Sequence, residues 1–148
     1  MSENYPKYYL YNRIVQAKLF IDAHYGKEID LGNIADEAYF SKFHFIRLFS
    51  SIYRKTPHQY LMYVRIENAK VLLQKDHPVN ETCFAVGFDS VSSFTALFKR
   101  HTNICPSKYQ QHFKERKRQM QEAPLRFIPN CFAESKGWTQ KSNFKEVE

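Results

Sequence analysis

The sequence has little glycine, few cysteines and no long apolar run. Only 4 of its 148 residues are glycine, and apolar residues recur at helical spacing, which predicts an all-α fold. The 3 cysteines include no C-x-x-C pair, so neither a zinc ribbon nor a redox dithiol is expected. No stretch approaches the ~18 apolar residues of a membrane span, and the N-terminus lacks the apolar core of a signal peptide. We therefore expect a soluble protein of the cytoplasm, a reducing compartment.

Motifs for catalysis and cofactor binding are absent as well. The 6 histidines show no H-E-x-x-H or other ligand spacing. The chain also has no glycine-rich phosphate loop and no G-x-S-x-G nucleophile elbow. We expect no enzyme, no cofactor and no metal site.

Acidic residues are missing from two stretches of a basic chain. The net charge is +7, and residues 38–66 and 90–114 contain no Asp or Glu. The basic residues of these stretches include Lys42, Arg47, Arg54, Lys55, Arg65, Lys99, Arg100, Lys108 and Lys114. A chance gap is one interpretation. Two gaps at matching points of a repeat favour the other, a surface that faces phosphate, because carboxylates near a DNA backbone would be repelled.

An internal repeat with an offset of 49 residues relates the two stretches. It aligns Ser41 with Ser90, Phe45 with Phe94, Leu48 with Leu97, Phe49 with Phe98, Pro57 with Pro106 and Tyr60 with Tyr109. Each copy has the pattern of a short helix, a turn and a second helix. In a helix-turn-helix unit the short helix supports the second one, whose outer face stays free to enter the major groove. The repeat therefore predicts two tandem helix-turn-helix subdomains joined by a long central helix.

The expected elements place a domain boundary near residue 112. A first helix is expected at about 8–24, with Ile14, Ala17 and Ile21 on one stripe, and a short last helix from Pro106 to about His112. Between them we expect helix-turn-helix 1 at about 30–52, the linker helix at about 57–74 and helix-turn-helix 2 at about 80–101. Residues 113–148 form a tail, basic and then aromatic. Its first part is a candidate extension of the last helix, and the rest is either partly disordered or an arm docked on the domain.

Smaller details of the two short helices are also predicted. Asp30 and Asn80 are the expected N-caps, because their side chains accept hydrogen bonds from the first backbone N–H groups. Small residues are expected where the two helices of a unit touch. These are Ala35 and Ala38 in the first copy and Cys83, Ala85 and Gly87 in the second.

Two segments carry a family resemblance: IADEAYFSKFHFIRLFSSIYRKTPHQYLMYVRIENAKVLL and VNETCFAVGFDSVSSFTALFKRHTNICPSKYQ. They are similar to the DNA-binding domain of the AraC/XylS family of bacterial transcription activators, over about residues 10–112. The V-G-F turn, the F-x-x-x-F-K helix and the P-x-x-Y end are the most specific part of the match. The resemblance implies seven helices in homeodomain-like units, with recognition helices in successive major grooves on one side of the DNA.

The outward helix faces and the resemblance together assign the contacts to DNA. Base contacts are expected from Lys42, Phe43, Ile46 and Arg47 in the first copy and from Val91, Ser92, Ser93 and Ala96 in the second. Phosphate contacts are expected from Ser50, Arg54, Lys55, Thr56, Lys99 and Arg100. Arg47 suits a bidentate guanine contact, and the apolar side chains suit thymine methyl groups. The alternative for Phe43 is a place in the core, and the short side chains of the second copy predict weaker readout.

The sequence departs from the family pattern at three positions. The family usually has glycine three residues before the proline that follows each recognition helix, where this chain has Arg54 and Asn103. Asparagine tolerates a left-handed backbone, whereas arginine is strained there unless the turn differs. Cys105 replaces the usual Ser or Thr cap; a small buried residue is favoured over a redox role.

Two functions remain open from the sequence. The first is a sequence-specific double-stranded DNA-binding regulator, an activator that also touches RNA polymerase, bound as a monomer in the nucleoid. The second is a helical adaptor that binds a protein through its aromatic tail. No small-molecule domain is evident in the chain.

Overall fold

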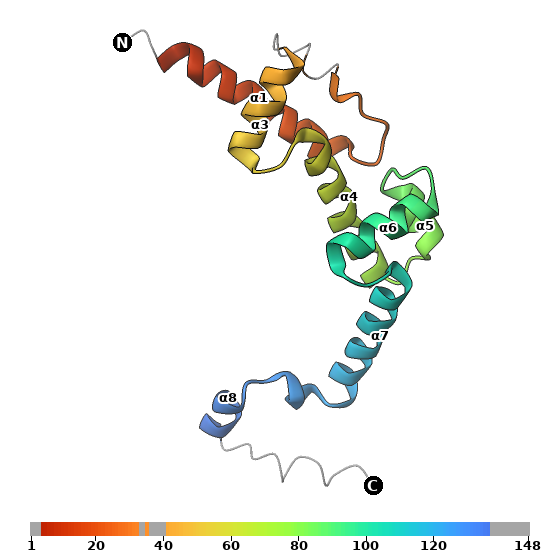
Figure 1. The fold of residues 1–148 in the computed structure, drawn as a ribbon. Helices are drawn as coiled ribbons and strands as arrows, with labels where there is room; N and C mark the ends of the chain where they lie inside the picture. The colour runs from red at the N-terminus through yellow and green to blue at the C-terminus, as the bar shows by residue number, and fades with distance from the viewer. Residues whose placement is uncertain (1–3, 33–34, 36–40, 137–148) are drawn as a thin grey trace, which may run out of the picture. The chain divides into compact units, whose positions relative to one another are not determined.

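The computed structural model describes residues 4–32, 35 and 41–136, and this part of the chain is helical without strands. The helices are α1 (Asn4–His24), α3 (Lys42–Tyr53), α4 (Pro57–Gln74), α5 (Val79–Ala85), α6 (Val91–Thr102), α7 (Pro106–Glu122), the 3-10 helix η1 (Pro124–Phe127) and α8 (Asn130–Ser135) (Figure 1). The predicted all-α fold with a long central helix is thereby confirmed. Most of the short first helix predicted for helix-turn-helix 1, after its expected cap Asp30 and including Ala38, lies outside the described residues.

The chain forms two compact units, Met1–Tyr109 and Gln110–Glu148. The first contains α1, α3, α4, α5 and α6, and α7 begins in it and continues into the second. Within the first unit, α4 runs from the group of α1 and α3 to the group of α5 and α6 (Figure 1). This helix therefore belongs to both copies of the repeat.

Equivalent residues begin and end the second helix of each copy. The Ser41 hydroxyl accepts a hydrogen bond from the backbone N–H of His44 at 3.3 Å, and the Ser90 hydroxyl accepts one from Ser93 at 3.2 Å. At the other end both helices stop at a left-handed residue, Arg54 with φ 60° and Asn103 with φ 65°. The sequence repeat is therefore a structural repeat down to its caps.

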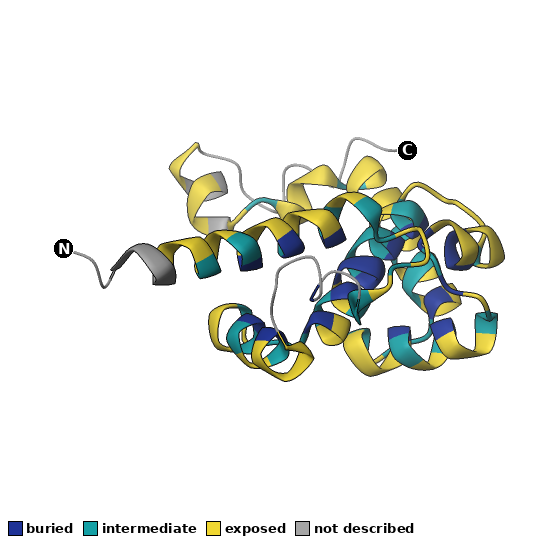
Figure 2. Ribbon diagram, turned by 90° about the horizontal axis from the view of Figure 1, so that it is seen from above, coloured by how far each residue is buried: buried dark blue, intermediate teal, exposed yellow. Residues whose placement is uncertain are grey.

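Each copy has its own apolar core. In the first, Phe45 and Phe49 of α3 pack with Ile14, Ala17, Ile21, Leu61 and Val64. In the second, Phe94 and Phe98 of α6 pack with Ile66, Ala69, Leu73, Cys83, Val86 and Phe88. The predicted stripe of α1 is confirmed, since its buried positions recur along one side of the helix (Figure 2). The helix α4 contributes residues to both cores.

Two tyrosines occupy matching places at the edges of these cores. Tyr60 meets Phe49 edge-on at 5.7 Å between ring centres, and Tyr109 meets Phe98 in the same way at 5.4 Å. The Tyr60 hydroxyl donates to Asp22 at 2.7 Å, and the Tyr109 hydroxyl accepts from the Gln74 amide at 2.8 Å. Burial, together with the Asp22 hydrogen bond, raises the pKa of Tyr60 to about 12. Tyr60 thus links α4 to α1, and Tyr109 links α7 to α4 in the same way.

Two local predictions for the second copy were wrong. Asn80 does not cap α5, because the helix already begins at Val79. Its N-cap is Pro78, whose φ of −57° suits a helix start. Ala85 is exposed and fills no gap between helices. Cys83 is fully buried and Gly87 adopts φ +95°, so these two expected small residues do occupy confined positions.

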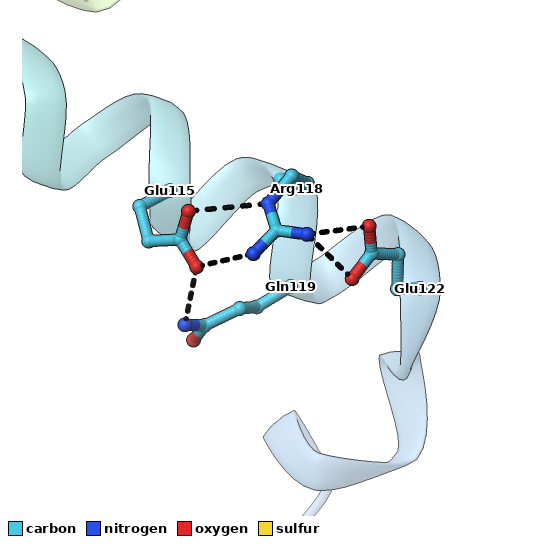
Figure 3. Close-up of polar contacts among 4 residues, drawn as sticks. All are labelled: Glu115, Arg118, Gln119 and Glu122. Atoms are coloured by element: carbon cyan, nitrogen blue, oxygen red, sulfur yellow. Dashed lines mark hydrogen bonds and ion pairs between the residues drawn. The ribbon is translucent and has the colours of Figure 1, made fainter.

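The helix α7 extends past His112 to Glu122, so the first part of the tail continues the last helix, which was the alternative expected for it. Its second half is held by polar pairs at helical spacing, in which Arg118 binds Glu115 at 2.7 Å and Glu122 at 2.8 Å (Figure 3). Gln119 also donates to Glu115 at 2.9 Å. The Arg118 guanidinium and then the Gln119 amide lower the pKa of Glu115. A single exposed pair stabilises a helix only weakly, but these pairs act together on one short segment of α7.

The unit Gln110–Glu148 has no buried residue among those described. Several of its apolar side chains are exposed: Met120, Leu125, Phe127 and Phe132. Arg116 lies 6.0 Å from the Phe127 ring centre, and Lys136 lies 5.9 Å from that of Phe132. The role of this tail, whether a docked arm or a binding segment, stays a prediction.

Candidate nucleic-acid interface

The outer faces of α3 and α6 carry the predicted base-contacting residues. On α3, Lys42, Phe43 and Arg47 are exposed and Ile46 is half-buried. On α6, Ser92, Ser93 and Ala96 are exposed and Val91 is half-buried. The structure therefore brings each predicted set onto one helix, with its outer members open to a partner.

Phe43 is an exposed aromatic residue and not part of a core. Its side chain is 77% exposed, the largest fraction among the exposed large apolar residues described. Ile46, three residues later, packs instead against the edge of the first core. Val91 of α6 packs likewise against the edge of the second core. Among the predicted base-contacting residues, Phe43 is thus the one large apolar side chain that is mostly exposed.

The basic residues of both faces lack acidic partners within the described part of the chain. No ion pair in that part includes Lys42, Arg47, Lys99 or Arg100. These side chains are all exposed, and the segments around them contain no carboxylate. Their charge is consequently available to an external anion.

Two predicted phosphate residues from different copies meet in one groove between α4 and α6. This groove has a volume of about 360 Å³ and is lined by Lys55, His58, Gln59, Met62, Leu97, Arg100 and His101. The Lys55 ammonium lies 5.0 Å from the Tyr63 ring centre, which keeps it beside the groove. Sequence reasoning missed His58 and His101; both fall in the acid-free stretches, which was the only available signal.

Two of the predicted phosphate-contacting residues, Ser50 and Thr56, already form hydrogen bonds within the protein. The Ser50 hydroxyl already donates to the Ile46 carbonyl at 2.7 Å. Thr56 and Gln59 form a reciprocal capping box at the start of α4, with distances of 3.2 and 2.9 Å. Thr56 therefore fixes the start of the helix and the position of its neighbour Lys55.

Cys105 occupies the place that Thr56 has in the first copy. Its thiol is half-exposed and lies 3.4 Å from the Ser107 hydroxyl. The hydrogen bond with Ser107, followed by the backbone N–H of Lys108, lowers the pKa of the thiol. The expectation of a small buried residue was wrong, because a residue at the start of a helix must face the unpaired N–H groups there.

The left-handed backbone of Arg54 predicts a measurable strain. Replacing Arg54 by glycine should raise the free energy of unfolding by roughly 0.5–1 kcal/mol, because a left-handed residue with a Cβ costs about 1–2 kcal/mol and the greater unfolded-state entropy of glycine offsets part of the gain. Ser51→Gly, in the exposed interior of α3, is the matched control and should lower it by about 0.5 kcal/mol. Chemical denaturation measures both, and equal losses in the two variants would contradict the strain.

Sequence comparison shows that the chain is similar to transcription regulators with a helix-turn-helix domain. The family model described as a helix-turn-helix domain matches residues 34–112. A transcriptional regulator in the cgkA 5′ region of Pseudoalteromonas carrageenovora is 35% identical over 104 residues, which are 69% of this chain and 61% of that protein. The bifunctional transcriptional activator/DNA repair enzyme AdaA of Bacillus subtilis (strain 168) is 29% identical over 96 residues, 64% of this chain and 46% of that protein.

A solved structure gives the same result. The DNA-binding domain of AdpA, a global transcriptional factor crystallised in complex with a target DNA, superposes with a TM-score of 0.68 at 27% identity. The match covers 72% of this chain and 96% of that one. The chain spans 35% to 61% of the length of three of the curated relatives that it matches.

The fold and the two outward helices define a double helix-turn-helix protein. The chain belongs to the AraC/XylS family of transcription regulators, as its resemblance implied. Among the described residues, no helix is both long and apolar enough to cross a membrane, and no group of three His, Cys, Asp or Glu side chains could bind a metal ion.

Proposed function

We propose that the chain binds double-stranded DNA sequence-specifically, with α3 and α6 in successive major grooves, and regulates transcription by doing so. The observation that carries this proposal is the matched pair of helices, each with equivalent caps and an exposed face without acids. The likeness to the AdpA domain, which was crystallised on its target DNA, supports it. A single chain carries two different recognition faces, so the bound form is a monomer on an asymmetric site.

The first recognition helix carries the stronger base readout. Arg47 is exposed at the centre of α3, where its guanidinium can donate two hydrogen bonds to guanine. Phe43 lies one turn earlier with its ring exposed, in position to contact a thymine methyl group. Lys42 and Ile46 flank these two residues. The first DNA segment is therefore expected to have the more stringent sequence.

The second recognition helix reads bases more weakly. Ser92 and Ser93 have short polar side chains, and the Ser93 hydroxyl accepts a hydrogen bond from Ser90 at 2.8 Å. Ala96 and the half-buried Val91 offer only apolar contact. Methyl contacts of this kind discriminate less than a bidentate pair, so the second DNA segment should tolerate more substitutions.

Phosphate contacts position both helices without reading sequence. Lys99 and Arg100 follow the base-reading part of α6, and Arg54, Lys55 and Thr56 follow that of α3. The groove that contains Lys55 and Arg100 suits a backbone phosphate between the two major-groove segments. Ser50 contributes little as a donor, since its hydroxyl is bonded to its own helix.

Activation of transcription through contact with RNA polymerase is the regulatory role we propose, in the bacterial cytoplasm and nucleoid. The relative AdaA is named a transcriptional activator, which supports this direction of regulation. AdaA is also named a DNA repair enzyme, but the likeness extends over 96 residues, 46% of that protein. We propose no enzymatic activity for the chain.

A gel-shift series against salt separates DNA binding from the adaptor alternative. Each phosphate neutralised by Lys or Arg releases counterions, so the logarithm of the binding constant should fall with that of salt concentration by about 0.9 per contact. We expect a slope of several units on a mixed-sequence duplex that spans two major grooves. The absence of any salt-dependent DNA binding, with capture of a protein by residues 110–148, would favour the adaptor.

A further inference from the structure

Arg65 is a buried arginine that lies between the two copies of the repeat. It belongs to α4, and only 8% of its surface is exposed. Its Nε donates to the Tyr25 carbonyl at 2.8 Å and its Nη2 to the Lys27 carbonyl at 3.0 Å. Burial lowers the pKa of this guanidinium, opposed by the charge of Asp89. A charge so placed is stabilised only while both carbonyls stay in position.

The other side of the Arg65 guanidinium faces the turn of the second helix-turn-helix unit. It lies 5.7 Å from the ring centre of Phe88, which belongs to the second core. Gly87 adopts φ +95°, and a Cβ there would approach the Tyr25 carbonyl oxygen to 2.8 Å and Nη2 of Arg65 to 2.9 Å. One guanidinium thus contacts the segment after α1 and the turn before α6.

The segment after α1 and the second unit approach each other closely at this point. A Cβ on Gly26 would lie 3.0 Å from the Ala85 carbonyl oxygen. Tyr25 and Met62 are the partly buried residues that pack against both cores. The two copies are therefore joined by α4 and by this contact, whose centre is Arg65.

We propose that Arg65 is a positioning residue that fixes α3 relative to α6 and so sets the spacing between the two DNA segments that the chain can bind. The inference rests on the proposed DNA binding. One base pair inserted between the segments displaces the second by about 3.4 Å and rotates it by about 35° around the helix axis. Two rigidly fixed recognition helices cannot follow such a change, whereas two helices joined by α4 alone can.

The spacing of a bound site tests this assignment. A duplex selected from a random pool by the wild-type chain is altered by inserting or deleting one or two base pairs between its segments. The wild-type chain should lose about tenfold or more in affinity per altered step, the scale of a lost base contact. Arg65→Met should bind the original site less tightly and lose less than about threefold on altered spacing.

Matched variants separate positioning from charge and from folding. Arg13→Met removes one arginine from α1, far in sequence from both recognition helices, and should keep the full spacing penalty. Thermal melting shows whether Arg65→Met folds; if it does not, Arg65→Lys, with its single ammonium in place of the fork, takes its place and should show an intermediate penalty.

The possible outcomes separate a failure of the role assigned to Arg65 from a failure of the proposed DNA binding. No selected site for the wild-type chain would contradict the proposed function itself. A selected site that the wild-type chain binds equally well at every spacing would overturn the role of Arg65 while leaving DNA binding intact. A folded Arg65 variant that keeps the wild-type spacing penalty would overturn it as well.

Discussion

Truncating Phe98 to alanine is expected to lower the free energy of unfolding by about 3–5 kcal/mol. Its side chain is fully buried, with ring centres 5.6 Å from Phe94 and 5.4 Å from Tyr109. Phe49→Ala should cost a similar amount, because Phe49 has the same place in the first core. Such losses approach the whole stability of a small domain, so each variant should also lose DNA binding.

Phe43→Ala is the matched control for these truncations. It removes the same ring from an exposed place on α3 and should change stability by no more than about 0.5 kcal/mol. Thermal and chemical denaturation compare the three variants directly. A loss at Phe43 as large as that at Phe98 would mean that the outer face of α3 packs against protein and is not free for DNA.

Arg47→Ala is expected to cost about 1–3 kcal/mol of specific binding and to relax preference at one or two base pairs, as the loss of a bidentate contact to guanine does. Lys99→Ala should weaken binding to all sequences alike and make the salt slope shallower by about 1, as the loss of a phosphate contact does. Binding to a set of single-base variants of the site, at two salt concentrations, measures both effects. Identical behaviour of the two variants would contradict the assignment of base reading to Arg47 and backbone binding to Lys99.

The repeat and its caps could be predicted because they are encoded locally. Their sequence signatures are a serine three residues before the backbone N–H that it caps, a proline at the start of the next helix, and two phenylalanines four residues apart. Applied at an offset of 49, these signatures located both cores and the exposed outer faces of α3 and α6. The left-handed turns at Arg54 and Asn103 followed from the family pattern.

The linkage between the two copies could not be predicted. Arg65 binds backbone carbonyls 38 and 40 residues away, and carbonyls carry no side-chain signature. The groove with Lys55 and Arg100 likewise needs the packing of α6 on α4 before its residues meet. The length of α7 stayed open between an end near His112 and an extension into the tail, because its second half is a charged run without a cap or an apolar stripe. Pairs such as Arg118 with Glu122 stabilise that half.

Hydroxyl-radical footprinting on a site selected from random DNA shows directly whether one chain binds two successive major-groove segments. One chain should protect two unlike segments on one side of the duplex, centred about 34 Å apart, which is one helical turn. A footprint of two symmetric half-sites, each requiring its own chain, would contradict it, as would a single protected segment.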